Sequence, residues 1–487
     1  MNPLSVKSKV IYGMGGIGDA STYNFIENYA LFFLTTIAGV QPAVAGMIVA
    51  IGSVWETISG AIVGYASDGL QCRMGKRKPF LLTAAVPLGV CLSLLFTAID
   101  VSATVKAVYY TAIMLLYTSA FSSFYVPYLT WGSEITQDYN ERSQIRGYVQ
   151  AFSSIGMVIG QALPMIAIDL LIRLGQTASQ SWQTMAIFCA SCATGCILVT
   201  GIFTKDKYEA VKKDSSQQAP AKANNPPKAA KAKGKKTGMI RAYIRALCFK
   251  PVACVFWASV FYLIGYAVFC ADRVYYFTYN MELSAGSISL IMFYMAVTSV
   301  VFIPLVLSAV KRLDKRLTYI IGMAISVVTM VLYGLIGIDT GLDVFLFITG
   351  YSFGSVVYWQ LMPALIYDVC EADQLMNRED RAGLLISLQT LAESIANAGG
   401  LQLLGLILSF AGFHGDLAVQ SQTALQWTSI SVSFIPALFM AASLYMILRY
   451  PITKGVYEKT VAALKKRESG EEPDLAEFER VYGRKSR

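Results

Sequence analysis

Long apolar stretches separated by short polar segments fill this chain almost to its end. The hydrocarbon core of a bilayer is about 30 Å thick, and a helix needs about 20 residues to cross it. The stretches lack the strict polar–apolar alternation of barrel strands and are too long for them. The pattern therefore predicts an all-α integral membrane protein. We expect its twelve transmembrane helices at 10–38, 43–68, 79–99, 105–133, 146–172, 182–204, 251–280, 285–310, 317–337, 342–370, 382–411 and 424–449.

The segments between these helices fall into two sets by charge. One set is rich in Lys and Arg, as in Arg73–Lys78, Lys311–Arg316 and the lysine-rich segment 205–250. The other set is short, and Lys106 and Arg173 are its main basic residues. The two sets alternate along the chain. Because loops rich in Lys and Arg stay in the cytoplasm, both termini are predicted to be cytoplasmic.

The basic segment 205–250 divides the chain. It combines Lys, Ala and Pro with few apolar residues, which predicts a disordered cytoplasmic linker. The segments 1–204 and 251–449 then form two bundles of six helices, and 450–487 forms a cytoplasmic tail. A basic linker beside a membrane favours contact with anionic lipid over nucleic acid. Six plus six helices with a cytoplasmic connector is the plan of the major facilitator fold.

Composition supports the membrane class and argues against others. Of the 487 residues, 55% are hydrophobic and 15% are charged, against about 25% charged in a soluble domain. The net charge of +9 lies mainly in loops, so we expect no nucleic-acid partner. Cys189, Cys192 and Cys196 share helical spacing, but no His or acid joins them, so we interpret them as packing residues rather than a metal site. No paired nucleophile and base and no cofactor motif indicates an enzyme.

Three acids lie near the middle of predicted spans: Asp19, Glu56 and Glu393. A charge at bilayer depth costs at least about 2.5–3.5 kcal/mol, so such residues are functional candidates. No Lys or Arg is expected at a similar depth. The acids are therefore protonated, hold a cation, or face a cationic substrate.

Several motifs, taken in order, resemble one family. They are Tyr12–Gly18, Leu31–Val40, Gly64–Asp68 with Arg73–Pro79, Val126–Tyr128 with Glu134 and Glu141–Arg142, Tyr275–Tyr279, Ile366–Glu371 and Ala398–Gly400. Together they resemble the glycoside–pentoside–hexuronide:cation symporters of the major facilitator superfamily. The resemblance covers both halves apart from the linker and the tail. It implies alternating access, with uptake of a sugar or glycoside driven by Na⁺ or H⁺.

Glu56 is the main candidate for ion coupling. It shares a helical face with Ser53, Ser59 and Gly60, and it falls where the family carries a cation-coordinating acid. The family's Na⁺ site also has an Asn three residues later and an Asp four residues later, which are Ser59 and Gly60 here; Ser122 matches a hydroxyl-bearing partner. One carboxylate of that oxygen-rich site is missing. A lone buried carboxylate suits a proton, which favours H⁺ over Na⁺. The alternative is that Glu56 only bonds a neighbouring helix.

The sugar site of the resembled family is largely replaced. Its Lys-Asp pair falls at Asp19–Ala20, its next Asp at Tyr125, and its Arg near Gln150. A Lys is absent, with Glu393 or Ser394 in its place, and an aromatic residue is kept as Trp359. An aromatic face can stack on a sugar or on a cation. Each polar candidate could instead make only an interhelical hydrogen bond. The predicted substrate-binding residues are Trp359, Tyr125, Gln150, Glu393, Tyr23 and Gln389.

Charged residues at the ends of predicted helices suggest a cytoplasmic gate. Opposite charges across a helix end can pair in one conformation and separate in another. The alternative is that the basic residues only fix the orientation in the membrane. The predicted gating residues are Asp68, Arg73, Lys76, Arg77, Asp368 and Glu371.

The sequence thus predicts a secondary active transporter that moves a small polar solute, a sugar or glycoside, together with a cation. We expect Glu56 to carry the coupling ion, assisted by Asp19, Ser59 and Ser122. The protein is expected in the cell membrane, surrounded by lipid, as a monomer without a cofactor. The competing hypotheses are a transporter of organic cations or of lipid-like or steroid-like solutes, and a membrane receptor that transports nothing.

Overall fold

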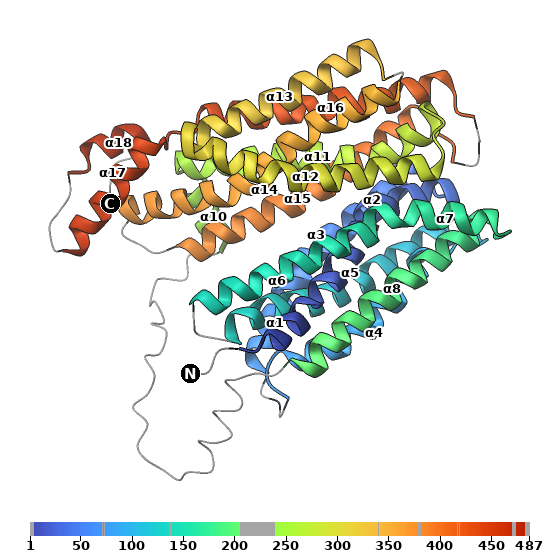
Figure 1. The fold of residues 1–487 in the computed structure, drawn as a ribbon, viewed down its shortest axis with the longest axis horizontal. Helices are drawn as coiled ribbons and strands as arrows, with labels where there is room; N and C mark the ends of the chain where they lie inside the picture. Colours follow the sequence, from blue (N-terminus) through green and yellow to red (C-terminus); the bar gives the residue numbers. More distant parts are fainter. Residues whose placement is uncertain are drawn as a thin grey trace, which may run out of the picture.

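The computed structural model describes residues 4–70, 72, 74–135, 139–204, 239–338, 340–377, 381–415, 417, 419–469 and 474–482. Within these ranges the protein is helical, and its helices form two bundles that lie side by side (Figure 1). Residues 205–238, most of the predicted linker, lie outside the described residues.

The first bundle contains the helices of the N-terminal half. They are α1 (Val6–Gly13), α2 (Gly15–Phe32), the π-helical η1 (Phe33–Ile37), α3 (Pro42–Gly69), α4 (Lys78–Leu95), α5 (Ala103–Glu134), α6 (Tyr139–Met157), the π-helical η2 (Val158–Ala162), α7 (Leu163–Arg173) and α8 (Ala178–Phe203). The sets α1–α2–η1 and α6–η2–α7 each follow one another directly, so these ten elements correspond to six predicted spans.

The second bundle contains the helices of the C-terminal half. They are α11 (Lys250–Tyr275), the π-helical η3 (Tyr276–Asn280), α12 (Ala285–Leu313), α13 (Lys315–Ile336), α14 (Gly341–Asn377), α15 (Ala382–Phe410) and α16 (Gln422–Leu448). Three shorter helices lie outside the predicted spans: α10 (Met239–Leu247), α17 (Lys454–Glu468) and α18 (Ala476–Tyr482).

The predicted disordered linker differs from the structure at its C-terminal end. Residues 239–247 form α10 rather than an irregular segment. The physical reason is visible in the sequence, where Ile240, Tyr243, Ile244 and Leu247 recur at helical spacing, with two arginines on the other positions. Tyr243 anchors this helix to the second bundle, because its hydroxyl lies 3.1 Å from Ser387 Oγ on α15.

Eleven helices within the described residues are long and apolar enough to cross a membrane. The remaining predicted span, 10–38, is also helical and packs against α6 and α8, but it lies outside this set. Its sequence explains why: Asp19, Asn24, Glu27 and Asn28 make its central helix more polar than the others. A helix this polar belongs inside a bundle rather than against lipid.

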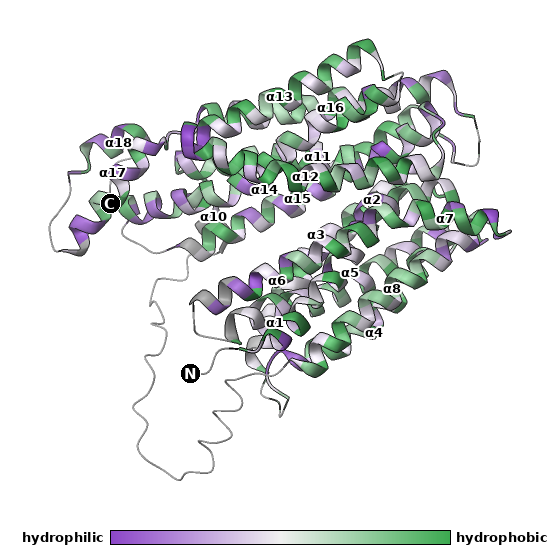
Figure 2. Ribbon diagram, viewed as in Figure 1, coloured by the Kyte–Doolittle hydropathy of each residue, from purple (hydrophilic) through white to green (hydrophobic). Residues whose placement is uncertain are grey.

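Apolar side chains cover much of the outside of both bundles. Residues with a large exposed fraction include Val300, Val301 and Leu305 on α12 and Val328 on α13. Hydrophilic residues concentrate at the helix ends and in α17 and α18 (Figure 2). This distribution fits a perimeter that faces lipid tails and ends that face water.

The two bundles meet at one end and diverge at the other (Figure 1). We call the end that carries η1 and η3 the closed end, and the end near α17 and α18 the tail end. At the closed end, Thr35 Oγ1 and Tyr275 Oη lie 2.6 Å apart across the interface, and Ser289 Oγ donates to the carbonyl of Ala162 at 2.7 Å. The helix α3 packs along α15, and α12 packs on α7. The protein is therefore closed at one end of its bundle interface.

Candidate functional site

Three polar side chains project from one face of α2. Asp19, Tyr23 and Glu27 are spaced four residues apart, so they lie above one another on the helix. Tyr23 and Glu27 line a cavity of about 30 Å³ between the two bundles. That volume holds one or two water molecules or a small cation and is too small for a monosaccharide. The cavity is lined by Tyr23, Ile26, Glu27, Val49, Ser53, Glu56, Met114, Tyr117, Thr118, Phe121, Asn397 and Leu401.

The predicted coupling residue Glu56 lies in this cavity, on α3. The carboxylate of Glu27 faces it from α2, and the two charges repel each other. Asp19 and Glu393 lie outside the cavity lining but close enough to interact electrostatically with Glu56. Negative charge therefore gathers from both bundles around one small polar cavity, which is where a cation would be stabilised.

Ser59 and Ser122 hold α3 against α5 in this structure. Their hydroxyl oxygens lie 2.8 Å apart, and each hydroxyl also donates to the backbone carbonyl of Glu56, at 3.0 and 3.1 Å. Both side chains are buried. These contacts place the two serines behind the Glu56 backbone, and neither lines the cavity that receives the Glu56 side chain.

Aromatic rings form a wall on the first bundle. The rings of Phe121 and Tyr125 stack with their centroids 5.5 Å apart, and Tyr23 lies 6.3 Å from Phe121. Tyr125 is half-buried, and Gln150 on α6 is exposed. The charges of Asp19, Glu56 and Glu393 reach the Tyr125 hydroxyl. Tyr23 and Tyr125 are thus brought together on one surface, whereas Gln150 has no described contact with them.

A second aromatic wall lies on the opposite bundle. Trp359 on α14 meets Tyr266 and Tyr358 edge to face, at centroid distances of 5.8 and 5.4 Å. Gln389 on α15 donates to the Tyr358 hydroxyl at 3.2 Å and lies 3.4 Å from Glu393 Oε1. The structure therefore groups Trp359, Gln389 and Glu393, the predicted substrate residues of the second half. Trp359 is 47% exposed, so its face is free to contact a solute.

Two polar contacts join the two bundles near the aromatic walls. Asn397 Nδ2 donates to the Tyr23 hydroxyl at 3.4 Å, and the hydroxyls of Thr57 and Ser394 form a short hydrogen bond. Each pair has one residue from α2 or α3 and one from α15. Both contacts therefore cross the interface between the bundles.

The predicted gate acids of the second bundle behave differently from each other. Lys315 Nζ donates to both carboxylate oxygens of Asp368, at 2.7 and 2.8 Å, and this ion pair joins α13 to α14. One carboxylate oxygen of Glu371 is buried and has no hydrogen-bond partner. The Asp368 pair lies within one bundle, so it braces that bundle at the tail end.

The gate residues of the first bundle are described only in part. Arg77 is buried and donates to Ser67 Oγ at 2.6 Å, which ties the start of α4 to the end of α3. Lys76 is exposed. Arg73 and the side chain of Asp68 lie outside the described residues. The gating role of this set stays a prediction.

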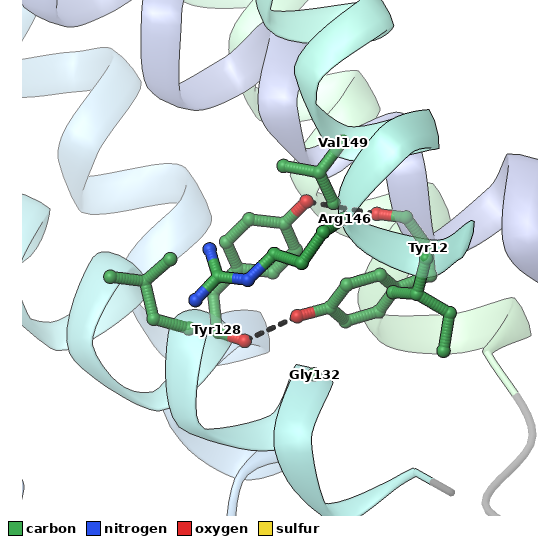
Figure 3. Close-up of a pocket in the computed structure, with 7 residues that line it drawn as sticks. Tyr12, Tyr128, Gly132, Arg146 and Val149 are labelled. Atoms are coloured by element: carbon green, nitrogen blue, oxygen red, sulfur yellow. Dashed lines mark hydrogen bonds between the residues drawn. The ribbon is translucent and has the colours of Figure 1, made fainter. Parts of the chain in front are cut away.

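A separate cavity of about 110 Å³ lies near the tail end, between α1, α5 and α6 (Figure 3). Tyr12 and Tyr128 close one side of it, because each hydroxyl donates to the other residue's backbone carbonyl, at 2.5 and 3.0 Å. Arg146 extends its guanidinium across the cavity, and Gly132 and Val149 complete the part that Figure 3 labels. None of the predicted site residues lines it.

Sequence reasoning missed part of the buried polar cluster at the interface. Glu27 was overlooked because counting inwards from the span ends placed only Asp19 near the middle of the first helix. The eight-residue spacing from Asp19 to Glu27, two helical turns, was the available signal. Asp272 and Arg273, both fully buried, also lie inside a predicted span. The expectation that no Lys or Arg lies at the depth of the acids was wrong, because Arg273 is close enough to Glu27 to interact with it electrostatically. Charged residues within a span are a functional signal wherever they occur.

The match to known families decides which kind of protein carries this site. A family model described as MFS/sugar transport protein matches residues 11–454, which include all twelve predicted spans apart from residue 10. The chain belongs to the MFS/sugar transport protein family. This assignment confirms the predicted family and the all-α membrane fold. It makes the protein a multi-pass membrane transporter of a small molecule, not an enzyme.

Relatives of this MFS/sugar transport protein match along most of their length. The isoprimeverose transporter of Lactiplantibacillus pentosus is 23% identical over 472 residues, which cover 94% of this chain and 91% of that protein. The glucuronide carrier protein homolog of Escherichia coli (strain K12) is 22% identical over 476 residues, covering 95% and 96%. The crystal structure of a D-xylose–proton symporter has a TM-score of 0.63 at 14% identity, covering 91% of this chain and 97% of that one, and it shows the same fold.

Proposed function

We propose that this MFS/sugar transport protein is a proton-coupled symporter that takes up a sugar or glycoside by alternating access. The observation that carries the proposal is the position of Glu56, which lines a water-sized cavity between the two bundles. A cation bound there contacts both bundles at once. Its binding can therefore bias the conformational equilibrium of the whole transporter.

A proton fits this site better than Na⁺. A sodium ion prefers several hard oxygen ligands in a fixed arrangement. Ser59 and Ser122, which match part of the family's Na⁺ site, are bonded to each other and to the Glu56 carbonyl instead. A buried carboxyl group needs no such shell to take up a proton.

The solute is proposed to bind between the two aromatic walls. Tyr23 and Tyr125 would contact it from the first bundle, and Trp359, Gln389 and Glu393 from the second. An aromatic face packs on the C–H face of a sugar ring, and the amide and carboxylate can bond its hydroxyls. Gln150, exposed on α6, is a further candidate towards the tail end.

The tail end is proposed to face the cytoplasm, with the protein in the cell membrane as a monomer. The basic residues Lys76, Arg77, Lys311, Lys315 and Arg316 all lie at this end, as the positive-inside rule requires. The described conformation is then closed towards the outside. In this state a solute would leave towards the cytoplasm.

One observation favours a second candidate substrate, an organic cation. Asp19, Glu27, Glu56 and Glu393 surround the interface, and Trp359 offers an exposed aromatic face. Acids and an aromatic face together are able to bind a cation. A neutral glycoside and an organic cation therefore belong in the same transport assay.

The test uses the purified protein in proteoliposomes. Neutral glycosides, anionic glycosides and organic cations are supplied with an inward pH gradient, an inward Na⁺ gradient, or neither. We expect accumulation of a glycoside driven by the pH gradient. We expect Glu56→Gln to abolish that accumulation but keep exchange of labelled for unlabelled solute, because the variant mimics a protonated site.

The matched control is Asp169→Asn. It removes an acid from a surface pair with Arg173, 2.9 Å away and remote from the cavity, so we expect normal uptake. The proposal is wrong if solute accumulation is unchanged by both ion gradients and by the Glu56→Gln substitution. Accumulation driven only by Na⁺ would overturn the choice of ion, and transport of organic cations alone would overturn the choice of solute.

A further inference from the structure

Glu27 is an acid that lies outside the motifs on which the resemblance to the symporter family rests. It is 8% exposed, and its side chain lines the small cavity opposite Glu56. No hydrogen bond or ion pair to the Glu27 carboxylate is described among the residues of this structure. A buried polar group normally has a partner, so an unpartnered acid aimed into a water-sized cavity points to a small ligand.

Arg273 is a fully buried cation close enough to Glu27 to interact with it electrostatically. It is 1% exposed and belongs to α11 of the second bundle. One of its guanidinium nitrogens, Nη2, donates to the side-chain oxygen of Asn28 across the bundle interface in a short hydrogen bond. Another, Nη1, lies 3.0 Å from the sulfur of Met295. Because Asn28 directly follows Glu27 in the chain, this contact keeps the positive charge near Glu27.

The partners of Arg273 are too weak to neutralise it. Its Nε atom is buried without a hydrogen-bond partner, and the other described contacts are an amide oxygen, a thioether and the ring of Phe269, 5.8 Å away. A buried charge needs an opposite charge. Glu27 supplies it, because the two groups attract each other although they form no direct ion pair.

Other titratable groups around Glu27 come from several helices. Tyr23 belongs to the same helix, Glu56 to α3, and the remaining groups to α11 and α14. Apart from Arg273 on α11, none of these groups is a base, so within this set Arg273 carries the positive charge. The groups that interact electrostatically with Glu27 are Tyr23, Glu56, Tyr266, Cys270, Arg273 and Tyr351.

We propose that Glu27 and Glu56 share one coupling cation in the interface cavity, and that Arg273 balances the charge that remains. This inference rests on the proposed symport function and names the second half of its ion site. Asp19 and Glu393 lie outside the cavity lining, so the site itself holds two carboxylates and one guanidinium, and when empty it carries a net charge of −1. One bound cation makes it neutral.

The charge balance explains how binding and movement are coupled. Closing the bundles around an uncompensated charge is costly, because the charge loses water without gaining a partner. The loaded site is neutral and can pass through the closed state. The empty site keeps a single negative charge instead of two, because Arg273 offsets one. Without Arg273 the return of the empty transporter would be much slower.

Three variants test this assignment in proteoliposomes with the substrate that the wild type accumulates. Glu27→Gln leaves the cation-free site neutral, so the transporter can carry its solute across without the cation. We expect uphill accumulation to fall by about a hundredfold, while exchange at saturating cation stays within about twofold of wild type. Asp169→Asn, on the surface, should behave as wild type.

Arg273→Gln should have the opposite kinetic signature. In this variant the loaded site carries −1, the charge with which the empty wild-type site returns, so exchange, which uses only the loaded form, should persist. Net uptake needs the empty form to return with a charge of −2 and should slow by about a hundredfold. The double variant Glu27→Gln/Arg273→Gln restores a charge of −1 to the empty site. We therefore expect it to regain cation-driven accumulation that each single variant lacks. Arg273→Lys keeps the charge and should retain net uptake.

The outcomes separate this inference from the proposed function. If wild-type accumulation ignores both pH and Na⁺ gradients, the symport proposal itself fails. If Glu56→Gln uncouples transport but Glu27→Gln accumulates normally, symport stands and the role of Glu27 is overturned. If Arg273→Gln slows exchange and uptake equally and the double variant rescues neither, Arg273 is only structural. The gradient that drives accumulation, pH or Na⁺, identifies the shared cation.

Discussion

At the scale of single residues, the sharpest question is what Ser59 and Ser122 do. The resemblance to the symporter family predicts that they assist the coupling ion. In the structure their hydroxyls bond to each other at 2.8 Å and to the Glu56 carbonyl, away from the cavity. Their contacts are those of a brace between α3 and α5.

We predict that Ser59→Ala weakens the protein without changing ion dependence. Removing a hydroxyl from this pair should lower the free energy of unfolding by about 1 kcal/mol. The pH dependence of uptake should match that of the wild type, whereas Glu56→Gln should remove it. Thermal unfolding and uptake at several external pH values measure the two effects. A shifted pH profile in Ser59→Ala would return this serine to the ion site.

The residues differ in how far the sequence could reveal them. Glu56 could be predicted, because an acid in the middle of an apolar stretch stands out. Glu27 is harder to find because polar neighbours on α2 make the whole helix look amphipathic rather than marking one acid. The relation between Glu27 and Arg273 could not be predicted at all. It depends on which turns of α2 and α11 face each other, and helical periodicity within one segment carries no such information.

At the scale of elements, the first helix of each half ends in the same way. η1 follows α2 and η3 follows α11, so both first helices finish in a π-helical segment at the closed end. Such segments are rare and occur often at functional sites. The two meet directly, since Thr35 in η1 lies 2.6 Å from the hydroxyl of Tyr275, the last residue of α11.

We predict that Tyr275→Phe opens the closed end. Thr35 keeps its bonds to backbone carbonyls within its own helix, so the substitution removes one contact between the bundles and leaves no buried group unpaired. A loss of about 1 kcal/mol changes the ratio of closed to open forms about fivefold. Hydrogen exchange of the amides in 33–40 and 276–283 should accelerate accordingly.

The control for this experiment is Tyr110→Phe. The Tyr110 hydroxyl also donates to a backbone carbonyl, that of Thr97, but at 2.8 Å within the first bundle. It should destabilise that bundle without changing exchange in 276–283. Equal effects of the two variants on that segment would show that the Thr35–Tyr275 contact does not control the closed end.

The elements themselves were largely predictable, with two instructive differences. Apolar length alone located the spans, because a bilayer sets the number of residues that a helix needs. It was less informative for the first span, whose polarity reflects its place between other helices. It was also misleading at α10, where low apolar content over 205–250 hid a short amphipathic helix that bonds Ser387 through Tyr243.

At the scale of the whole molecule, the closed end depends on close backbone contact between α3 and α15. Gly46 and Gly405 face each other where the two helices cross (Figure 1 shows both helices). A Cβ atom added at Gly405 would lie 2.5 Å from the carbonyl oxygen of Pro42 and 3.0 Å from Cα of Gly46. Small residues at such a crossing let helices approach, so this conformation requires glycine there.

We predict that Gly405→Ala shifts the protein towards the conformation open at this end. The clash exists only while the bundles are in contact, and overpacking of this kind costs about 1–3 kcal/mol. Because about 1.4 kcal/mol is tenfold in an equilibrium constant, the open form should gain roughly tenfold in population. Hydrogen exchange should rise at the start of α3 and the end of α15 and should fall at the tail end, where opening of one side accompanies closure of the other.

Gly399→Ala is the matched control, since it lies on the same helix and an added Cβ there meets nothing within 4 Å. Both variants gain the same intrinsic helix stability from alanine, so the difference between them isolates the crossing. If hydrogen exchange in Gly405→Ala rises at both the closed end and the tail end, the substitution destabilises the protein generally and does not rock the bundles. A reciprocal change would show that closure of one end and opening of the other are one motion, centred on the cavity that holds Glu27 and Glu56.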